Sequence, residues 1–182
     1  MNKTFISVAF AVVLTGCASM GGGSGGGVEI LGIDDQLEDE IKVSSFSFSR
    51  PFMGVVSIET GDPFFRAYID KTGGKEKTLQ LYVLTNNSDW MYWDEARFQM
   101  DGVLVKIPMA RVGSNVDCSQ YGCWHSEDVV GTVMSEHVQF IAEQQQPVTV
   151  RLTSSRVSSN TDFQIPPEEA KAFLEAVGKA TQ

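Results

Sequence analysis

The segment Trp124-His125-Ser126-Glu127 holds the residue types that acid–base chemistry uses. His125 could serve as a general base near neutral pH, and Glu127 could orient it. Side chains of consecutive residues do not face one another, however, and the chain lacks the paired histidines of zinc proteases and the lysine-containing phosphate loop. Its only other histidine is His137. We therefore expect no catalytic residues, and a small hydrolase that uses His125 with a carboxylate is the alternative.

A second group of candidates is aromatic. Trp90-Met91-Tyr92-Trp93 begins a stretch, residues 90–100, that the sequence predicts as a strand. Alternation along a strand places Trp90 and Tyr92 on one face and Met91 and Trp93 on the other. One face belongs to the core, and the other could present aromatic rings to a ligand or partner. Trp90, Tyr92 and Trp93 are the candidate binding residues, and burial of both faces is the alternative.

The amino terminus carries a different kind of signal. Cys17 ends the run Leu14-Thr15-Gly16-Cys17, behind Lys3 and an apolar stretch at residues 5–14. A positive start, a short apolar middle and small residues at the cut describe an export signal. The four-residue ending resembles the lipobox of bacterial lipoproteins. The resemblance implies cleavage before Cys17, a thioether to diacylglycerol and acylation of the new amino terminus, for which palmitate is the natural label.

Two alternatives to this lipoprotein reading fit less well. A membrane-spanning helix needs about 20 apolar residues, which is more than this stretch provides. An ordinary secreted protein needs no cysteine at its cleavage site. In the lipoprotein family, an aspartate after the lipidated cysteine favours inner-membrane retention, so Ala18 implies the outer membrane. We expect the domain to face the periplasm. In a source with one membrane, the chain would sit on the outer face of the plasma membrane.

Three cysteines are an odd number for an exported protein. If Cys17 carries lipid, Cys118 and Cys123 remain and can form a disulfide, because export leads to an oxidising compartment. The chain-entropy model gives about 2 kcal/mol for so short a loop. Zinc binding by this pair with His125 or His137 is the alternative, but it needs more ligands at suitable spacing. We predict no metal and no other cofactor.

The charge balance limits the partners. The chain of 182 residues has 14 basic and 23 acidic residues and a net charge of −9. Lys3 is the only charged residue of the signal, so its removal leaves a more acidic mature chain. Such a surface repels nucleic acid and anionic head groups, and we expect no nucleic-acid partner. Attachment to the membrane would therefore depend on several acyl chains at Cys17 rather than on a basic patch.

We divide the chain into a signal peptide (1–16), a lipidated cysteine with a flexible Gly/Ser-rich tether (17–27) and a single β-rich domain (28–182). Short strands between Gly, Pro and Asn turns favour an antiparallel β-sandwich or a partly open barrel, with two short covering helices. Strands and helices do not alternate as in α/β folds. The predicted strands are 43–49, 52–60, 64–70, 78–85, 90–100, 103–107, 128–133, 147–153 and 157–165, and the predicted helices are 136–145 and 168–177.

Two local patterns carry further expectations. In the strand 43–49, Phe46 and Phe48 are expected to face the core, with serines on the other face. The acidic run at residues 34–40 is interpreted as a solvated entry segment, and calcium binding there is a weak alternative because the spaced loop is lacking.

These patterns predict a lipid-anchored cell-envelope protein with a non-catalytic binding or structural module, whose partner is an envelope protein. The first alternative is the small envelope hydrolase. The second is a carrier of an apolar ligand, which would need a large dry cavity beside the Trp90–Trp93 segment.

Overall fold

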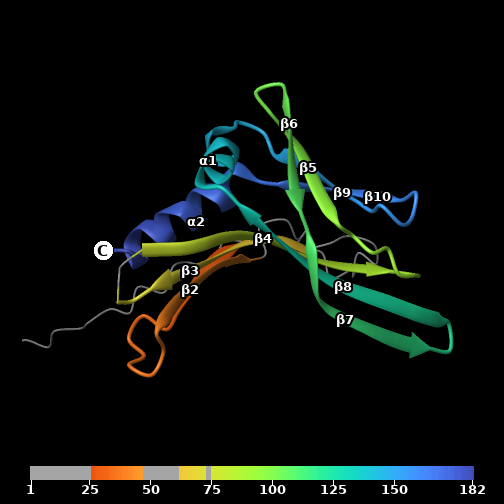
Figure 1. Cartoon of the computed structure of the whole chain (residues 1–182), viewed down its shortest axis with the longest axis horizontal. Helices are drawn as coiled ribbons and strands as arrows, with labels where there is room; N and C mark the ends of the chain where they lie inside the picture. Colours follow the sequence, from red (N-terminus) through yellow and green to blue (C-terminus); the bar gives the residue numbers. More distant parts are fainter. Residues whose placement is uncertain (1–25, 47–61, 73–74) are drawn as a thin grey trace, which may run out of the picture.

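The computed structural model describes residues 26–46, 62–72 and 75–182. Cys17, most of the tether and the predicted strand 52–60 lie outside these residues. The described part forms two antiparallel sheets and two helices (Figure 1), which confirms the mainly β, α+β sandwich; the two sheets stay open rather than closing into a barrel. The elements are β1 (Gly27–Leu31), β2 (Glu40–Phe46), β3 (Asp62–Asp70), β4 (Lys75–Asn87), β5 (Glu95–Met100), β6 (Val103–Pro108), β7 (Ala110–Ser119), β8 (Gly122–Val133), α1 (Ser135–Glu143), β9 (Val148–Thr153), β10 (Asn160–Ile165) and α2 (Pro167–Ala180).

The larger sheet has the strand order β1-β2-β3-β4-β8-β7, and the smaller has the order β10-β9-β5-β6. One face of the larger sheet forms the core, which the two helices and the smaller sheet share. Phe65 of β3 stacks on Phe173 of α2, with ring centroids 5.5 Å apart, and Phe98 of β5 stacks on Phe140 of α1 at 6.4 Å. In the described part of the chain, neither helix is long and apolar enough to cross a membrane.

A tight corner joins the two sheets. β6 belongs to the smaller sheet and β7 to the larger, with only Met109 between them. The corner lies on Gly131 of β8, where an added Cβ would be 2.5 Å from Ile107 Cγ2 and 2.8 Å from the Pro108 carbonyl oxygen. Such distances leave no room for a side chain, so the corner requires glycine at this position.

The prediction that Phe46 faces the core is wrong. Phe46 is 47% exposed, whereas Ser45 is fully buried. Ser45 Oγ donates a hydrogen bond to Glu169 Oε1 at 2.6 Å and accepts one from the Phe65 N–H at 2.8 Å. Because Val43 is buried and side chains alternate along a strand, Ser45 must point inward as well. Phe48 lies outside the described residues.

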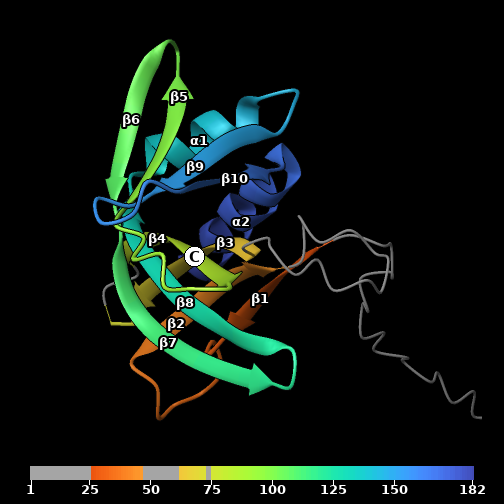
Figure 2. The same cartoon turned by 90° about the vertical axis from the view of Figure 1, so that its right-hand side faces the viewer.

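The largest difference between the predicted and the observed strands is the β7–β8 hairpin. The predicted strand 128–133 is only the end of β8, and β7 was not predicted at all. Figure 2 shows this hairpin extending from one end of the molecule and the β5–β6 hairpin from the other. Nearly all of β7 is exposed, so it lacks the apolar alternation that identifies a strand in a sequence. Cys118 and Cys123 lie opposite each other near its turn and form the disulfide, with an S–S distance of 2.07 Å.

The helices begin and end close to their predicted limits. The cap of α1 is Met134, and α2 continues three residues beyond its predicted end, through Gly178 to Ala180. On the inner faces of the helices, Val138, Ile141, Phe173 and Val177 are buried, and Ala142 and Ala172 are half-buried.

Candidate binding site

The Trp90–Trp93 segment is a loop and not a strand. β4 ends at Asn87 and β5 begins at Glu95, so the prediction of a strand from residue 90 is wrong in its first five residues. The backbone turns at Tyr92, whose φ of 56° lies in the left-handed region. This conformation costs about 1–2 kcal/mol for a residue with a Cβ. A residue keeps such a conformation only where contacts with the surrounding structure hold it.

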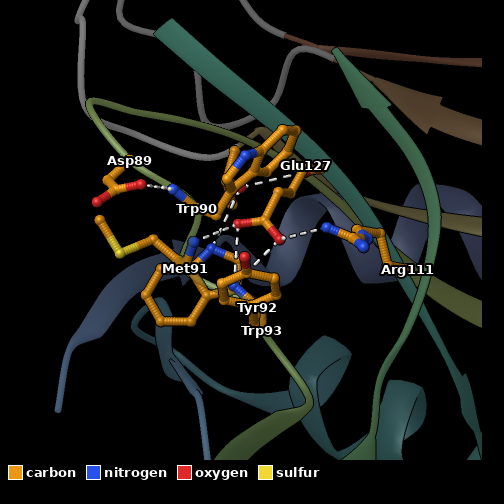
Figure 3. A network of polar contacts seen from close by, with 8 residues as sticks. Asp89, Trp90, Met91, Tyr92, Trp93, Arg111 and Glu127 are labelled. Carbon is orange, nitrogen blue, oxygen red and sulfur yellow. Dashed lines mark hydrogen bonds and ion pairs between the residues drawn. The ribbon is translucent and has the colours of Figure 1, made fainter. Parts of the chain in front are cut away.

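Glu127 of β8 holds the loop. Its side chain is fully buried, and its carboxylate accepts a hydrogen bond from the Met91 N–H at 2.7 Å and from the Tyr92 N–H at 3.1 Å. Arg111 Nη1 lies 3.5 Å from Glu127 Oε1 and supplies the opposite charge (Figure 3). Burial of a carboxylate is costly unless it is hydrogen-bonded and paired, and Glu127 is both. Glu127 is therefore a positioning residue for the loop.

A second chain of contacts fixes Trp93. Its Nε1–H donates to Thr85 Oγ1 at 3.2 Å, and the Thr85 hydroxyl donates to the Glu127 carbonyl oxygen at 3.1 Å. The Trp93 side chain is only 3% exposed and belongs to the core. Of the three candidate binding residues, Trp90 and Tyr92 are half-buried and reach the surface, and Trp93 does not.

Two arginines converge on the rings of this loop. The Arg111 guanidinium carbon lies 5.5 Å from the centroid of the Trp90 ring and 5.6 Å from that of Tyr92. The Arg156 guanidinium carbon lies 5.0 Å from the Tyr92 centroid. These distances are those of cation–π contacts. Trp, Tyr and Arg are also the residue types that dominate binding energy at protein interfaces.

The turn between β9 and β10 brings Arg156 to the loop. Asp94 Oδ2 accepts hydrogen bonds from the Ser155 N–H, at 2.9 Å, and from its hydroxyl. These bonds hold the pKa of Asp94 below its ordinary value, and the nearby positive charges of Arg156 and Arg97 lower it further. Asp94 thus fixes the turn that carries Arg156 to the segment that carries Tyr92.

His125 borders the same site. Its ring meets the Trp90 ring at an angle of 69°, with centroids 4.8 Å apart, and it lies opposite Asn87 in the β4–β8 pairing. Within the described part of the chain, His125 Nδ1 and Asn87 Nδ2 are buried and have no hydrogen-bond partner. Buried polar atoms of this kind are uncommon, and they mark this edge of the site as polar but incompletely satisfied.

The geometry bears on the hydrolase alternative. His125 and Glu127 are two residues apart on β8 and so share a face of the strand. The Glu127 carboxylate is occupied by the loop N–H groups and Arg111, and it makes no hydrogen bond with His125 among the described contacts. The structure therefore brings the two side chains near one loop without forming a histidine–carboxylate dyad.

The other candidate sites lie elsewhere. A shallow depression is lined by the loop at residues 33–39 and by Lys71, so it collects the acidic run and not the aromatic segment. In the parts of the chain that the structure describes, no three His, Cys, Asp or Glu side chains come together as a metal site. His137 lies in α1, where its ring meets Phe98 at 5.7 Å.

Sequence reasoning did not identify Arg111, Arg156 or Asn87 as members of this site. They come from β7, from the β9–β10 turn and from the end of β4, and no local motif links them to Trp90. Comparison of the chain with protein-family models, with curated proteins and with solved structures found no match.

Proposed function

We propose that this protein is a lipid-anchored component of the cell envelope whose β-sandwich is a non-catalytic binding module for another envelope protein. The binding surface consists of Trp90, Tyr92, Arg111 and Arg156, and we call it the Tyr92 surface. The outer-membrane address belongs to the same proposal and is supported by Ala18, and we expect the domain to face the periplasm.

The strained backbone of Tyr92 is the observation that carries the binding proposal. The backbone of Tyr92 keeps a costly positive φ. The fully buried Glu127 carboxylate holds it there by accepting hydrogen bonds from two backbone N–H groups, and two arginines contact its half-buried ring. The turn places Trp93 in the core and leaves the Tyr92 ring half-buried, so one aromatic ring of the loop is presented at the surface. Preorganised aromatic and arginine side chains reduce the entropy lost on association, which favours recognition of a partner.

The anchor rests on the lipobox-like run that ends at Cys17. Cells grown with labelled palmitate are expected to incorporate the label into the wild-type protein and not into a Cys17→Ser variant. A wild-type protein without label would contradict the anchor. Replacement of Ala18 by Asp should move the protein to the inner membrane in a host that sorts lipoproteins, and unchanged fractionation would contradict the outer-membrane address.

The binding proposal is tested by site-specific photo-cross-linking in intact cells. A photoreactive phenylalanine at position 92 should give a discrete cross-linked envelope protein, and the same group at Tyr121, which is 90% exposed at the hairpin turn, should not. The identified partner, once purified, should bind the wild-type protein and lose about tenfold or more in affinity to Tyr92→Ala, as expected for an interface hot spot. Equal cross-linking at both positions, or equal affinity, would remove the proposal.

An activity assay on the purified wild-type protein and on His125→Ala separates the binding proposal from the hydrolase alternative. Turnover of an envelope substrate that disappears in His125→Ala would replace the binding module by the hydrolase alternative. No turnover in either protein is the expected result.

A further inference from the structure

The Tyr92 surface has an unusual distribution of charge. The protein as a whole is acidic, with a net charge of −9, yet two guanidinium groups approach one tyrosine ring to within 5.0 and 5.6 Å of its centroid. Both groups add positive charge around the same ring, which favours an anion there. The two groups come from separate elements, β7 and the β9–β10 turn, so their convergence is a property of the fold.

The carboxylates of the protein compensate these cations only in part. Glu127 lies 3.5 Å from Arg111, but it is buried beneath the loop and its oxygens already accept the Met91 and Tyr92 N–H groups. Asp94 is directed to Ser155 and acts on Arg156 through its charge alone. Arg111 makes this one ion pair, and neither guanidinium donates a hydrogen bond to a side chain among the described residues. Arg111 is 42% exposed and Arg156 is exposed, so their N–H groups are open to a ligand.

We infer that Arg111 and Arg156 form an oxyanion site on the Tyr92 surface, which binds a carboxylate or a phosphate group of the partner. This inference rests on the proposed binding function and adds the chemistry of the group recognised. The planar guanidinium matches the spacing of two oxygens on a carboxylate or phosphate. The Tyr92 ring contacts both cations, and the Ser155–Asp94 bonds fix the turn that carries Arg156, so little side-chain freedom is lost on binding.

Three tryptophans allow the site to be observed directly. Trp90 lies beside Arg111, and Trp93 lies in the core. Trp124 lies on the face of β8 opposite to His125 and Glu127. The full chain is purified with 15N in the indole rings and titrated with sodium acetate or sodium phosphate at constant ionic strength. The Trp90 signal should move to saturation while the signals of Trp93 and Trp124 stay in place. Acetamide, which has the shape of acetate without its charge, should produce no shift.

Variants decide whether the arginines are responsible. Arg156→Gln changes an exposed side chain and should weaken the binding of the anion about tenfold, the loss expected for one charge-assisted hydrogen bond. Arg97→Gln is the matched control, because Arg97 is already paired with Glu95 on β5, and it should leave the affinity unchanged. Arg111→Gln should have an effect as large as that of Arg156→Gln, provided that the Trp93 signal shows an intact core.

The two anions identify the source of the ligand group. Tighter binding of acetate assigns an acidic side chain or chain terminus of a protein, and tighter binding of phosphate assigns a phosphorylated partner. Shifts that do not saturate, that persist in Arg156→Gln or that acetamide reproduces would overturn the inference. This titration needs no partner, so the two proposals can fail separately. Saturable anion binding without a cross-linked protein at position 92 would reject the proposed function and keep the oxyanion site. A cross-linked protein at position 92 without anion binding would keep the proposed function and reject the oxyanion site.

Discussion

The backbone N–H of Tyr92 donates to both carboxylate oxygens of Glu127, each at 3.1 Å, although the two residues lie 35 positions apart in the chain. The contact connects the loop after β4 to the middle of β8. It places a buried negative charge directly behind a residue with positive φ, and it explains why an aromatic side chain is held there at the surface.

Replacement of Glu127 by Gln should destabilise the fold by about 1–3 kcal/mol, because an amide presents only one acceptor to two N–H groups and leaves Arg111 without its counter-ion. Urea unfolding measures this free energy. Glu95→Gln breaks a partly exposed ion pair with Arg97 and should change stability by less than about 1 kcal/mol. Equal effects of the two substitutions would show that Glu127 does not hold the loop.

The left-handed conformation of Tyr92 predicts that glycine is more stable than alanine at this position, the reverse of the usual order in a strand. Tyr92→Gly should be more stable than Tyr92→Ala by about 1–2 kcal/mol, because only glycine adopts this conformation without cost. At Tyr82, in the extended strand β4, glycine should instead be less stable than alanine by about 0.5–1 kcal/mol. Thermal unfolding of the four variants tests the comparison. Both variants at position 92 should lose partner binding.

The corner over Gly131 gives a third prediction. Gly131→Ala forces a methyl group against the Pro108 carbonyl oxygen and should cost about 1–3 kcal/mol, the usual penalty for overpacking. Gly178→Ala is its control, because no atom lies within 4 Å of the added Cβ and the residue is in α2. There the substitution should stabilise by about 0.5–1 kcal/mol. A Gly131→Ala protein as stable as the wild type would contradict the close contact.

The Asp94–Ser155 bonds predict a dependence of stability on pH. The folded state lowers the pKa of Asp94 below its ordinary value of 3.8, so the folded state favours the charged carboxylate. Its contribution is present above that ordinary value and is lost as the pH falls through the lowered pKa. Asp94→Asn should therefore reduce stability at neutral pH and narrow its difference from the wild type in acid. Chemical unfolding at several pH values measures this, with Asp117→Asn on the exposed strand β7 as the control.

Loss of the disulfide should act mainly on the hairpin. Paired Cys118→Ser and Cys123→Ser substitutions should cost about 2 kcal/mol in the chain-entropy model. Hydrogen exchange should speed up in the outer half of β7 and β8 and remain slow in β3 and β4, which lie in the centre of the sheet. Uniform acceleration across all strands would show that the bond stabilises the whole fold instead.

The fold class, the strands near the core and both helices could be predicted because apolar residues recur there with a regular period. The prediction was wrong where buried and exposed positions do not follow the alternation of apolar and polar residues. Ser45 is polar and buried, since Glu169 and the Phe65 N–H satisfy it from distant parts of the chain. β7 is a strand with almost no buried face, so only its pairing with β8 defines it.

The candidate site divides in the same way. The aromatic composition of the loop singled out Trp90 and Tyr92, but Trp93 entered the core because the backbone turns at Tyr92. That turn depends on Glu127, and the charge at the surface depends on Arg111 and Arg156. None of these three is close to the loop in sequence, and their contribution appears only when the strands are assembled.

The corner at Met109 has a consequence for how the two sheets can move. One uninterrupted stretch of backbone supplies an edge strand to each sheet, so a displacement of β6 is passed to β7, and thus to the other sheet, through a single residue.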